Sequence, residues 1–136
     1  MNTIQKFVVL FGILILISSC SSLFGQDDTL SGSDWVLTSL NGEPPLSESQ
    51  PTISFESGEI NGSTGCNQYF GEYDSSEIHL DISDLGWTEM ACLSPEGVMT
   101  QEQQFMKSLQ ETNQYQINGD QLTLVSESSS LLFEKQ

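Results

Sequence analysis

The sequence predicts an α+β domain that is mostly β, closed or half-closed, with one helix packed on it. Short segments alternate apolar and polar residues, as strands with one buried face do. Asn-Gly and Ser-Gly pairs separate several of these segments, and only one stretch has helical periodicity. A length of 136 residues corresponds to one domain.

About eight short strands follow from this pattern. The first runs from Trp35 to Leu40 and ends at the Asn41-Gly42 turn. The others are expected around residues 53–55, in the glycine-punctuated segment 60–73, and around 78–82, 85–90, 115–117, 122–124 and 131–133. The large aromatic side chains expected in the core are Trp35, Phe55, Trp87, Phe105 and Phe133.

One amphipathic helix is expected after the fifth or sixth strand. Ser94 is suited to its N-cap, Pro95 to its first turn, and Glu96 to the positive end of the helix dipole. Thr112 and Asn113 end it. The apolar residues that fall on one face at helical spacing are Val98, Met99, Phe105, Met106 and Leu109.

The N-terminal segment is typical of a bacterial lipoprotein signal peptide. The apolar run from Phe7 to Ile17 follows Lys6 and is too short to span a bilayer core of about 30 Å. Residues 17–20 (ISSC) resemble a lipobox, in which cleavage before Cys20 lets that cysteine carry acyl chains such as palmitate. Several acyl chains anchor a domain without a spanning helix. An ordinary secretory signal with an incidental cysteine is the alternative.

The expected organisation is a signal peptide over residues 1–19, a flexible tether over 20–32 and a folded domain over 33–136. The tether is rich in Ser, Gly and Asp. Ser21, a residue other than Asp after the lipobox cysteine, favours the outer membrane. We therefore expect a lipid-anchored protein of the cell envelope that faces the periplasm or the exterior.

The formal net charge of −16 reflects 3 basic and 19 acidic residues. Without a basic patch to neutralise phosphates, the sequence argues against nucleic-acid binding and against attachment to an anionic membrane by charge. One histidine and three cysteines leave little material for a zinc site. We therefore expect no metal and no cofactor.

Cys66 and Cys92 remain once Cys20 is lipidated, and export places them in an oxidising compartment. An even pair of cysteines in that setting predicts a disulfide. A redox-active pair is the alternative. It is disfavoured because the spacing is far from Cys-x-x-Cys and no cluster of bases flanks either thiol to lower its pKa.

Two motifs resemble the META/HslJ-like domain family: GCNQYFGEY at residues 65–73 and TEMAC at residues 88–92. The resemblance covers roughly residues 33–135 and includes Trp35, Glu102, Phe105 and Leu109. Phe70 occupies a variable position of the first motif.

This resemblance implies a small α+β domain whose antiparallel strands curl into a partly open barrel around or against one helix. It also implies a bridge between Cys66 and Cys92. Members of the family are envelope lipoproteins or secreted proteins without an established enzymatic activity, some of them linked to heat-shock induction.

Asn67 and Thr88 are polar residues inside the two cysteine motifs. They are candidates for a shared surface groove near the bridge. Alternatively, each side chain hydrogen-bonds backbone amides at a bulge.

Catalytic interpretations of the other polar residues have little support. His79, the only histidine, falls on the polar face of its strand. A carboxylate general acid needs an apolar pocket that raises its pKa, whereas carboxylates beside turns are solvated. The two carboxylate groups that flank turns are Glu56 with Glu59, and Glu77 with Asp81 and Asp84.

We therefore expect a non-enzymatic, membrane-tethered envelope module that acts in protein interaction or stress response with an unidentified envelope protein. The alternative is a carrier that binds a small apolar ligand or lipid in a crevice of the barrel, which would require an apolar cavity. A hydrolase would require a cleft with a desolvated carboxylate.

Overall fold

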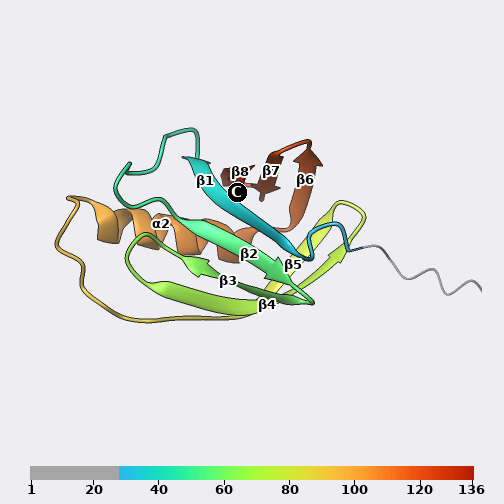
Figure 1. The fold of residues 1–136 in the computed structure, drawn as a ribbon, viewed down its shortest axis with the longest axis horizontal. Coiled ribbons are helices and arrows are strands. Elements are labelled where there is room, and N and C mark those ends of the chain that lie inside the picture. Colours follow the sequence, from blue (N-terminus) through green and yellow to red (C-terminus); the bar gives the residue numbers. More distant parts are fainter. Residues whose placement is uncertain (1–27) are drawn as a thin grey trace, which may run out of the picture.

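The computed structural model describes residues 28–136, which form one closed antiparallel barrel and one helix (Figure 1). The mostly β class with a single packed helix is confirmed for this part of the chain. No helix within it is long and apolar enough to cross a membrane. The predicted signal peptide (1–19), the lipidation site Cys20 and residues 20–27 of the tether lie outside the described residues.

The elements follow the order expected from the sequence. They are β1 (Ser33–Leu40), β2 (Thr52–Glu56), β3 (Glu59–Ser63), β4 (Gln68–Ser76), β5 (His79–Trp87), α2 (Val98–Glu111), β6 (Gln114–Asn118), β7 (Gln121–Val125) and β8 (Ser130–Lys135).

The barrel is closed, so the expectation of a partly open barrel is wrong. β8 pairs with β1 from Trp35–Lys135 to Leu40–Leu131, which joins the two ends of the sheet. The shortest ladder lies between β5 and β6, where His79 opposite Gln114 is the one registered pair. Such pairings join residues far apart in the chain, and an alternating pattern within one strand carries no information about them.

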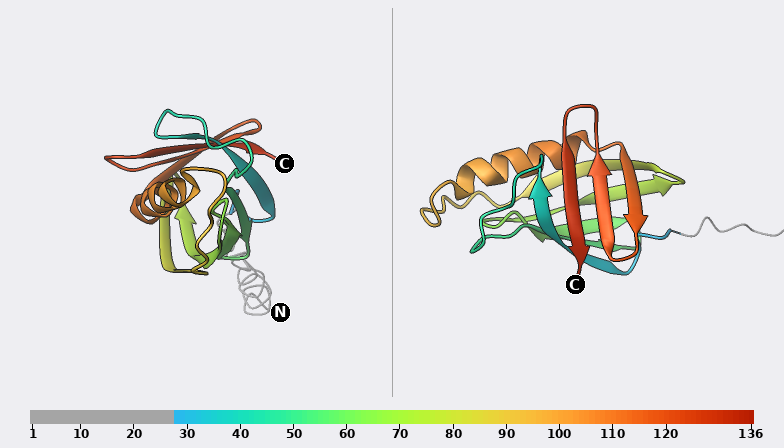
Figure 2. Two further views of the ribbon diagram at one scale, coloured as in Figure 1. Left: turned by 90° about the vertical axis from the view of Figure 1, so that its left-hand side faces the viewer. Right: turned by 90° about the horizontal axis from the view of Figure 1, so that it is seen from above.

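Helix α2 packs against β5, β7 and β8, beside the narrow β5–β6 ladder (Figure 2). Its Phe105 is fully buried and touches aromatic rings from two parts of the barrel. The ring centroids lie 5.7 Å from Tyr69 on β4 and 6.5 Å from Phe133 on β8, both in edge-to-face geometry. The helix therefore contributes to the same core as the strands.

Four of the five expected core aromatics are buried, but Trp87 is 43% exposed at the end of β5. β5 is one strand from His79 to Trp87, not the two strands expected around 78–82 and 85–90. A bulge opposite Gly71 lets it continue, with Asp84 in a left-handed conformation (φ 50°). Ile78 precedes the strand and is exposed.

The helix begins at Val98, later than the expected N-cap at Ser94. Gly97 is the N-cap and has a left-handed backbone (φ 89°), with no side-chain cap. The chain before Gly97 therefore cannot continue the helical path. Pro95 instead accepts a hydrogen bond from the Val98 amide (3.1 Å) in a turn.

The folded domain begins earlier than the expected boundary at residue 33. Leu30 is fully buried in the core. The Asp28 carboxylate accepts hydrogen bonds from the Tyr73 hydroxyl and from Ser75 (3.1 Å). Burial, together with the hydrogen bond to Asp28, raises the pKa of Tyr73 to about 12. Residues 28–32 are thus part of the domain and not of the tether.

We predict that the free energy of unfolding falls as the pH rises from 10 to about 12. In this window the unfolded chain has lost the Tyr73 proton while the folded protein still holds it, so deprotonation favours unfolding. Below this window the contribution is fully present. Urea unfolding across this pH range should show a smaller decline for Tyr73→Phe than for the wild type. Equal declines in the two proteins would contradict the assignment.

Candidate functional site

The disulfide between Cys66 and Cys92 joins two connections of the barrel. Cys66 lies between β3 and β4, and Cys92 lies between β5 and α2, with Cα atoms 6.0 Å apart. The predicted pairing is confirmed. Closing a loop with a sequence separation of 26 stabilises the fold by about 3–4 kcal/mol in the chain-entropy model.

Asn67, next to the disulfide, is fully buried and does not line a surface groove. Its Oδ1 accepts hydrogen bonds from the Met90 amide (2.7 Å) and the Thr88 hydroxyl (2.8 Å). Its Nδ2 donates to the Met90 carbonyl (3.1 Å). The exposed Thr88 in turn accepts from the Gln68 amide (3.2 Å). The structure thus brings the two predicted residues together, but in a cluster that fixes the backbone after β5.

Glu102 of α2 is the other half of this cluster. Its carboxylate is 5% exposed and receives hydrogen bonds from the Asn67 amide (3.2 Å), the Asn67 side chain (2.9 and 3.0 Å) and the Thr64 hydroxyl. No cation contacts it among the described residues. A buried carboxylate needs such donors because desolvation is costly.

In the sequence, Glu102 is singled out only by the family resemblance. Its position indicates more, because it is four residues after Val98 and three before Phe105, on the buried face of the helix. A charged residue at such a position predicts a buried hydrogen-bond partner. The partner itself comes from a segment 35 residues away, which the spacing does not identify.

Gln101, the residue before Glu102 on α2, also hydrogen-bonds a connection of the barrel. Its side chain accepts a hydrogen bond from the Leu46 amide (2.7 Å) and donates to the Ser49 carbonyl (2.7 Å). The Ser49 hydroxyl donates to the Gly65 carbonyl. The connection between β1 and β2 is therefore held against both the helix and the cysteine loop.

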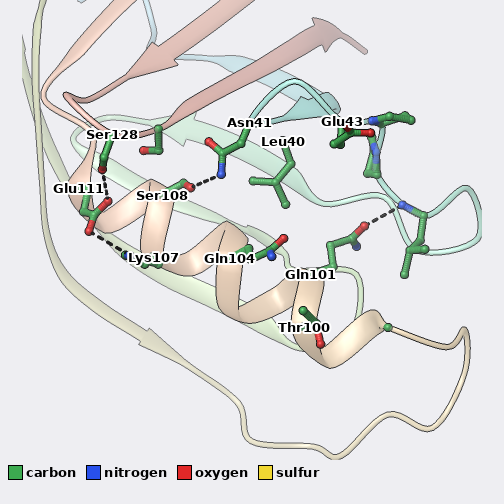
Figure 3. A pocket seen from close by; sticks show the side chains of 15 residues that line it. Leu40, Asn41, Glu43, Thr100, Gln101, Gln104, Lys107, Ser108, Glu111 and Ser128 are labelled. Carbon is green, nitrogen blue, oxygen red and sulfur yellow. Dashed lines mark hydrogen bonds and ion pairs between the residues drawn. The ribbon is translucent and has the colours of Figure 1, made fainter.

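A cleft of about 610 Å³ lies between this connection, the outer face of α2 and the β7–β8 turn (Figure 3). Asn41 donates to Ser108 (3.4 Å) across it, and Ser128 donates to Glu111 (3.0 Å). Lys107 forms an ion pair with Glu111 at 3.9 Å. Figure 3 shows Gln104 on α2 between Ser108 and Gln101, with its side chain directed toward the β1–β2 connection.

The sequence does not predict this cleft. The helical residues that line it recur at the spacing of one helix face, which adjoins the apolar face and shares the buried Gln101 and Ser108 with it. Such a polar face is ordinarily assigned to solvent. The opposing wall comes from the loop with Pro44 and Pro45. The lining residues on α2 are Thr100, Gln101, Gln104, Lys107, Ser108 and Glu111.

The residues considered for catalysis are dispersed over the surface. His79 is exposed. The described residues contain no group of three His, Cys, Asp or Glu side chains that could hold a metal ion. One member of each predicted carboxylate group, Glu59 of the first and Asp84 of the second, lines a hollow on the outside of the barrel. Glu72 lines the same hollow.

The two polar features differ in what they can do chemically. Asn67, Thr64 and Glu102 satisfy one another, so their cluster holds the structure together and presents no free group to a ligand. The cleft instead offers amide, hydroxyl and charged groups at the surface of the molecule. Of the two, the cleft is the candidate binding site.

We predict that Asn67→Ala and Glu102→Gln each lower the free energy of unfolding by about 1–3 kcal/mol, because each leaves buried hydrogen-bonding groups unpaired. Glu111→Gln makes the same isosteric change at an exposed position of α2 and should cost less than about 0.5 kcal/mol. Urea unfolding with the disulfide intact measures all three. A loss in Glu102→Gln no larger than in Glu111→Gln would contradict the structural role of the cluster.

Comparison with known proteins agrees with this architecture. The chain is 29% identical over 135 residues to the heat shock protein HslJ of Escherichia coli K12, a match that covers 96% of this chain and 95% of that protein.

Three solved structures share the fold. An NMR structure of a protein from Burkholderia xenovorans is 24% identical and has a TM-score of 0.65, over 79% of this chain and 83% of that chain. A second NMR structure is 31% identical, with a TM-score of 0.64, over 77% of this chain and 90% of that chain. A crystal structure of a DUF4847 family protein from Bacteroides vulgatus is 15% identical, with a TM-score of 0.60, over 81% of this chain and 96% of that chain. The sequence matches the META domain over residues 28–136, and the chain belongs to this family.

Proposed function

We propose that this META domain protein is a lipid-anchored lipoprotein of the bacterial envelope, without enzymatic activity, whose barrel serves as a protein-interaction module in a stress response. Its anchor is Cys20, at the end of the lipobox-like segment ISSC. The proposed location is the outer membrane. The similarity to a heat shock protein over nearly the whole chain supports the stress-response assignment.

The observation that carries the interaction role is a preformed cleft on the outside of a filled barrel. The barrel interior is occupied by fully buried side chains such as Trp35, Phe55 and Phe133. The cleft beside α2 has a wall fixed by Gln101 and by the disulfide-linked connections. A site that is ordered before binding costs less entropy on association.

The carrier alternative has weaker support. An apolar ligand needs a largely apolar pocket, but the core side chains fill the barrel. The cleft outside the barrel is lined by the charged residues Glu43, Lys107 and Glu111, which suit an apolar ligand poorly.

Anchoring makes a direct prediction. Cys20→Ala should abolish incorporation of radiolabelled palmitate and move the protein from the membrane fraction to the soluble fraction, because acylation requires that thiol. Ser19→Ala keeps a small residue before the cysteine and is the matched control. A Cys20→Ala protein that stays in the membrane fraction would refute the lipid anchor.

The cleft makes a second prediction. A photo-crosslinking amino acid in place of Gln104 should yield discrete crosslinked species in intact envelopes. The same replacement at Gln116, exposed on β6, is the control and should yield none of them. Crosslinks of equal pattern and yield at both positions would indicate random contacts and contradict a partner in the cleft.

A further inference from the structure

Phe70 is an apolar side chain left uncovered on the outward face of the sheet. It is 62% exposed and lies on β4 between Asn61 of β3 and Gly86 of β5. A Cβ atom at Gly86 would lie 2.7 Å from Cζ of Phe70, so the ring lies across this glycine. The absence of a side chain at Gly86 thus leaves room for the ring of Phe70 beside β5, and the greater part of the side chain is exposed to solvent.

Three carboxylates, of Glu59, Glu72 and Asp84, line the same hollow as this ring. Glu59 and Glu72 are directly opposite each other on β3 and β4, two cross-strand pairs along from the Asn61–Phe70 pair. Asp84 belongs to the β5 bulge and has a left-handed backbone (φ 50°). It lines the same hollow as Glu59 and Glu72. The ring and the three carboxylates together line a hollow of about 380 Å³.

No lysine or arginine forms an ion pair with these carboxylates within residues 28–136. The one ion pair in that part of the chain joins Lys107 to Glu111, on the helix. Like charges directly opposite each other on neighbouring strands are destabilising, as Glu59 and Glu72 are here. A bound cation would relieve this repulsion. The carboxylates do not form a group able to hold a metal ion, so a larger organic cation fits better.

We propose that this face, formed by Phe70, Glu59, Glu72 and Asp84, docks a segment of a partner protein that bears lysine or arginine. The cation lies over the exposed face of the Phe70 ring, and the carboxylates neutralise its charge. Arginine suits this site because its planar guanidinium stacks on a ring and pairs with carboxylates at once. The proposal deepens the proposed interaction role by naming the partner's chemistry, and it requires neither the lipid anchor nor the cleft beside α2.

The test uses the full chain, purified in a non-ionic detergent, and a fluorescein-labelled peptide, Gly-Arg-Gly-Arg-Gly amide. Fluorescence anisotropy measures its Kd. Phe70→Leu keeps an apolar side chain but removes the ring, and should weaken binding about threefold to tenfold. The pair Glu59→Gln and Glu72→Gln should weaken it by a similar factor, and added salt should do so as well.

The control removes the same number of charges elsewhere. Asp120→Asn with Glu134→Gln changes two carboxylates of another surface hollow, lined without an aromatic ring, and should leave the Kd within about twofold. Equal weakening by this control would show attraction to the net charge alone and would overturn the proposal. Wild-type affinity in Phe70→Leu would overturn it too, as would spermidine binding as tightly as the peptide.

The proposal rests on the proposed interaction role, but its failure can be distinguished from a failure of the proposed anchor or cleft. Failure of the lipid anchor appears in the Cys20→Ala fractionation, and failure of the cleft appears in the crosslinks at Gln104. The peptide affinity of the purified chain depends on neither. Circular dichroism of each variant confirms that an altered Kd reflects the site and not a loss of folding.

Discussion

Helix α2 packs on the barrel beside β5, where β5 and β6 are joined by a single registered pair. The rest of the structure depends on this arrangement. The apolar face of α2 places Phe105 among the rings of Tyr69 and Phe133. The same face carries Glu102, whose buried carboxylate needs donors that, within residues 28–136, the segment from Thr64 to Asn67 supplies. Dispersion and apolar burial hold the helix to the core, while these directional bonds set its position along the barrel.

The cysteine loop follows from this constraint. Asn67 links Glu102 on one side to the backbone at Met90 on the other, and the disulfide joins the same two connections covalently. Gln101 extends the network to the β1–β2 connection through Leu46 and Ser49. One end of the barrel is therefore cross-linked by a covalent bond and by polar side chains, and the wall of the cleft beside α2 is part of that end.

Alternation and turn residues in the sequence identify most strands, because a strand with one buried face repeats every two residues. The buried face of α2 and the paired cysteines are equally predictable. Closure of the barrel is not, since it depends on pairing between β1 and β8 at opposite ends of the domain. The exposure of Trp87 and the start of α2 depend on a bulge and on a left-handed glycine, which alternation and helical spacing do not reveal; the N-cap is Gly97, three residues after the expected Ser94.

The Asn67–Glu102 cluster can be predicted from the sequence only in part. A polar residue in an apolar stripe indicates that a partner exists, but local spacing cannot say which one. The hollow around Phe70 is similar, because Glu59, Glu72 and Asp84 come from three strands. Their proximity is a property of the register and not of any single segment.

The closed barrel has a consequence for how any partner can bind. An open sheet presents an edge strand whose free backbone N–H and C=O groups recruit another chain as an extra strand. Here β1 pairs with both β2 and β8, so the described barrel offers no such edge at its two ends. A partner that binds the wall formed by β8, β1, β2 and β3 therefore has to recognise side chains, because each of these strands is paired on both sides. Selectivity there rests on the residues that project from the outer surface.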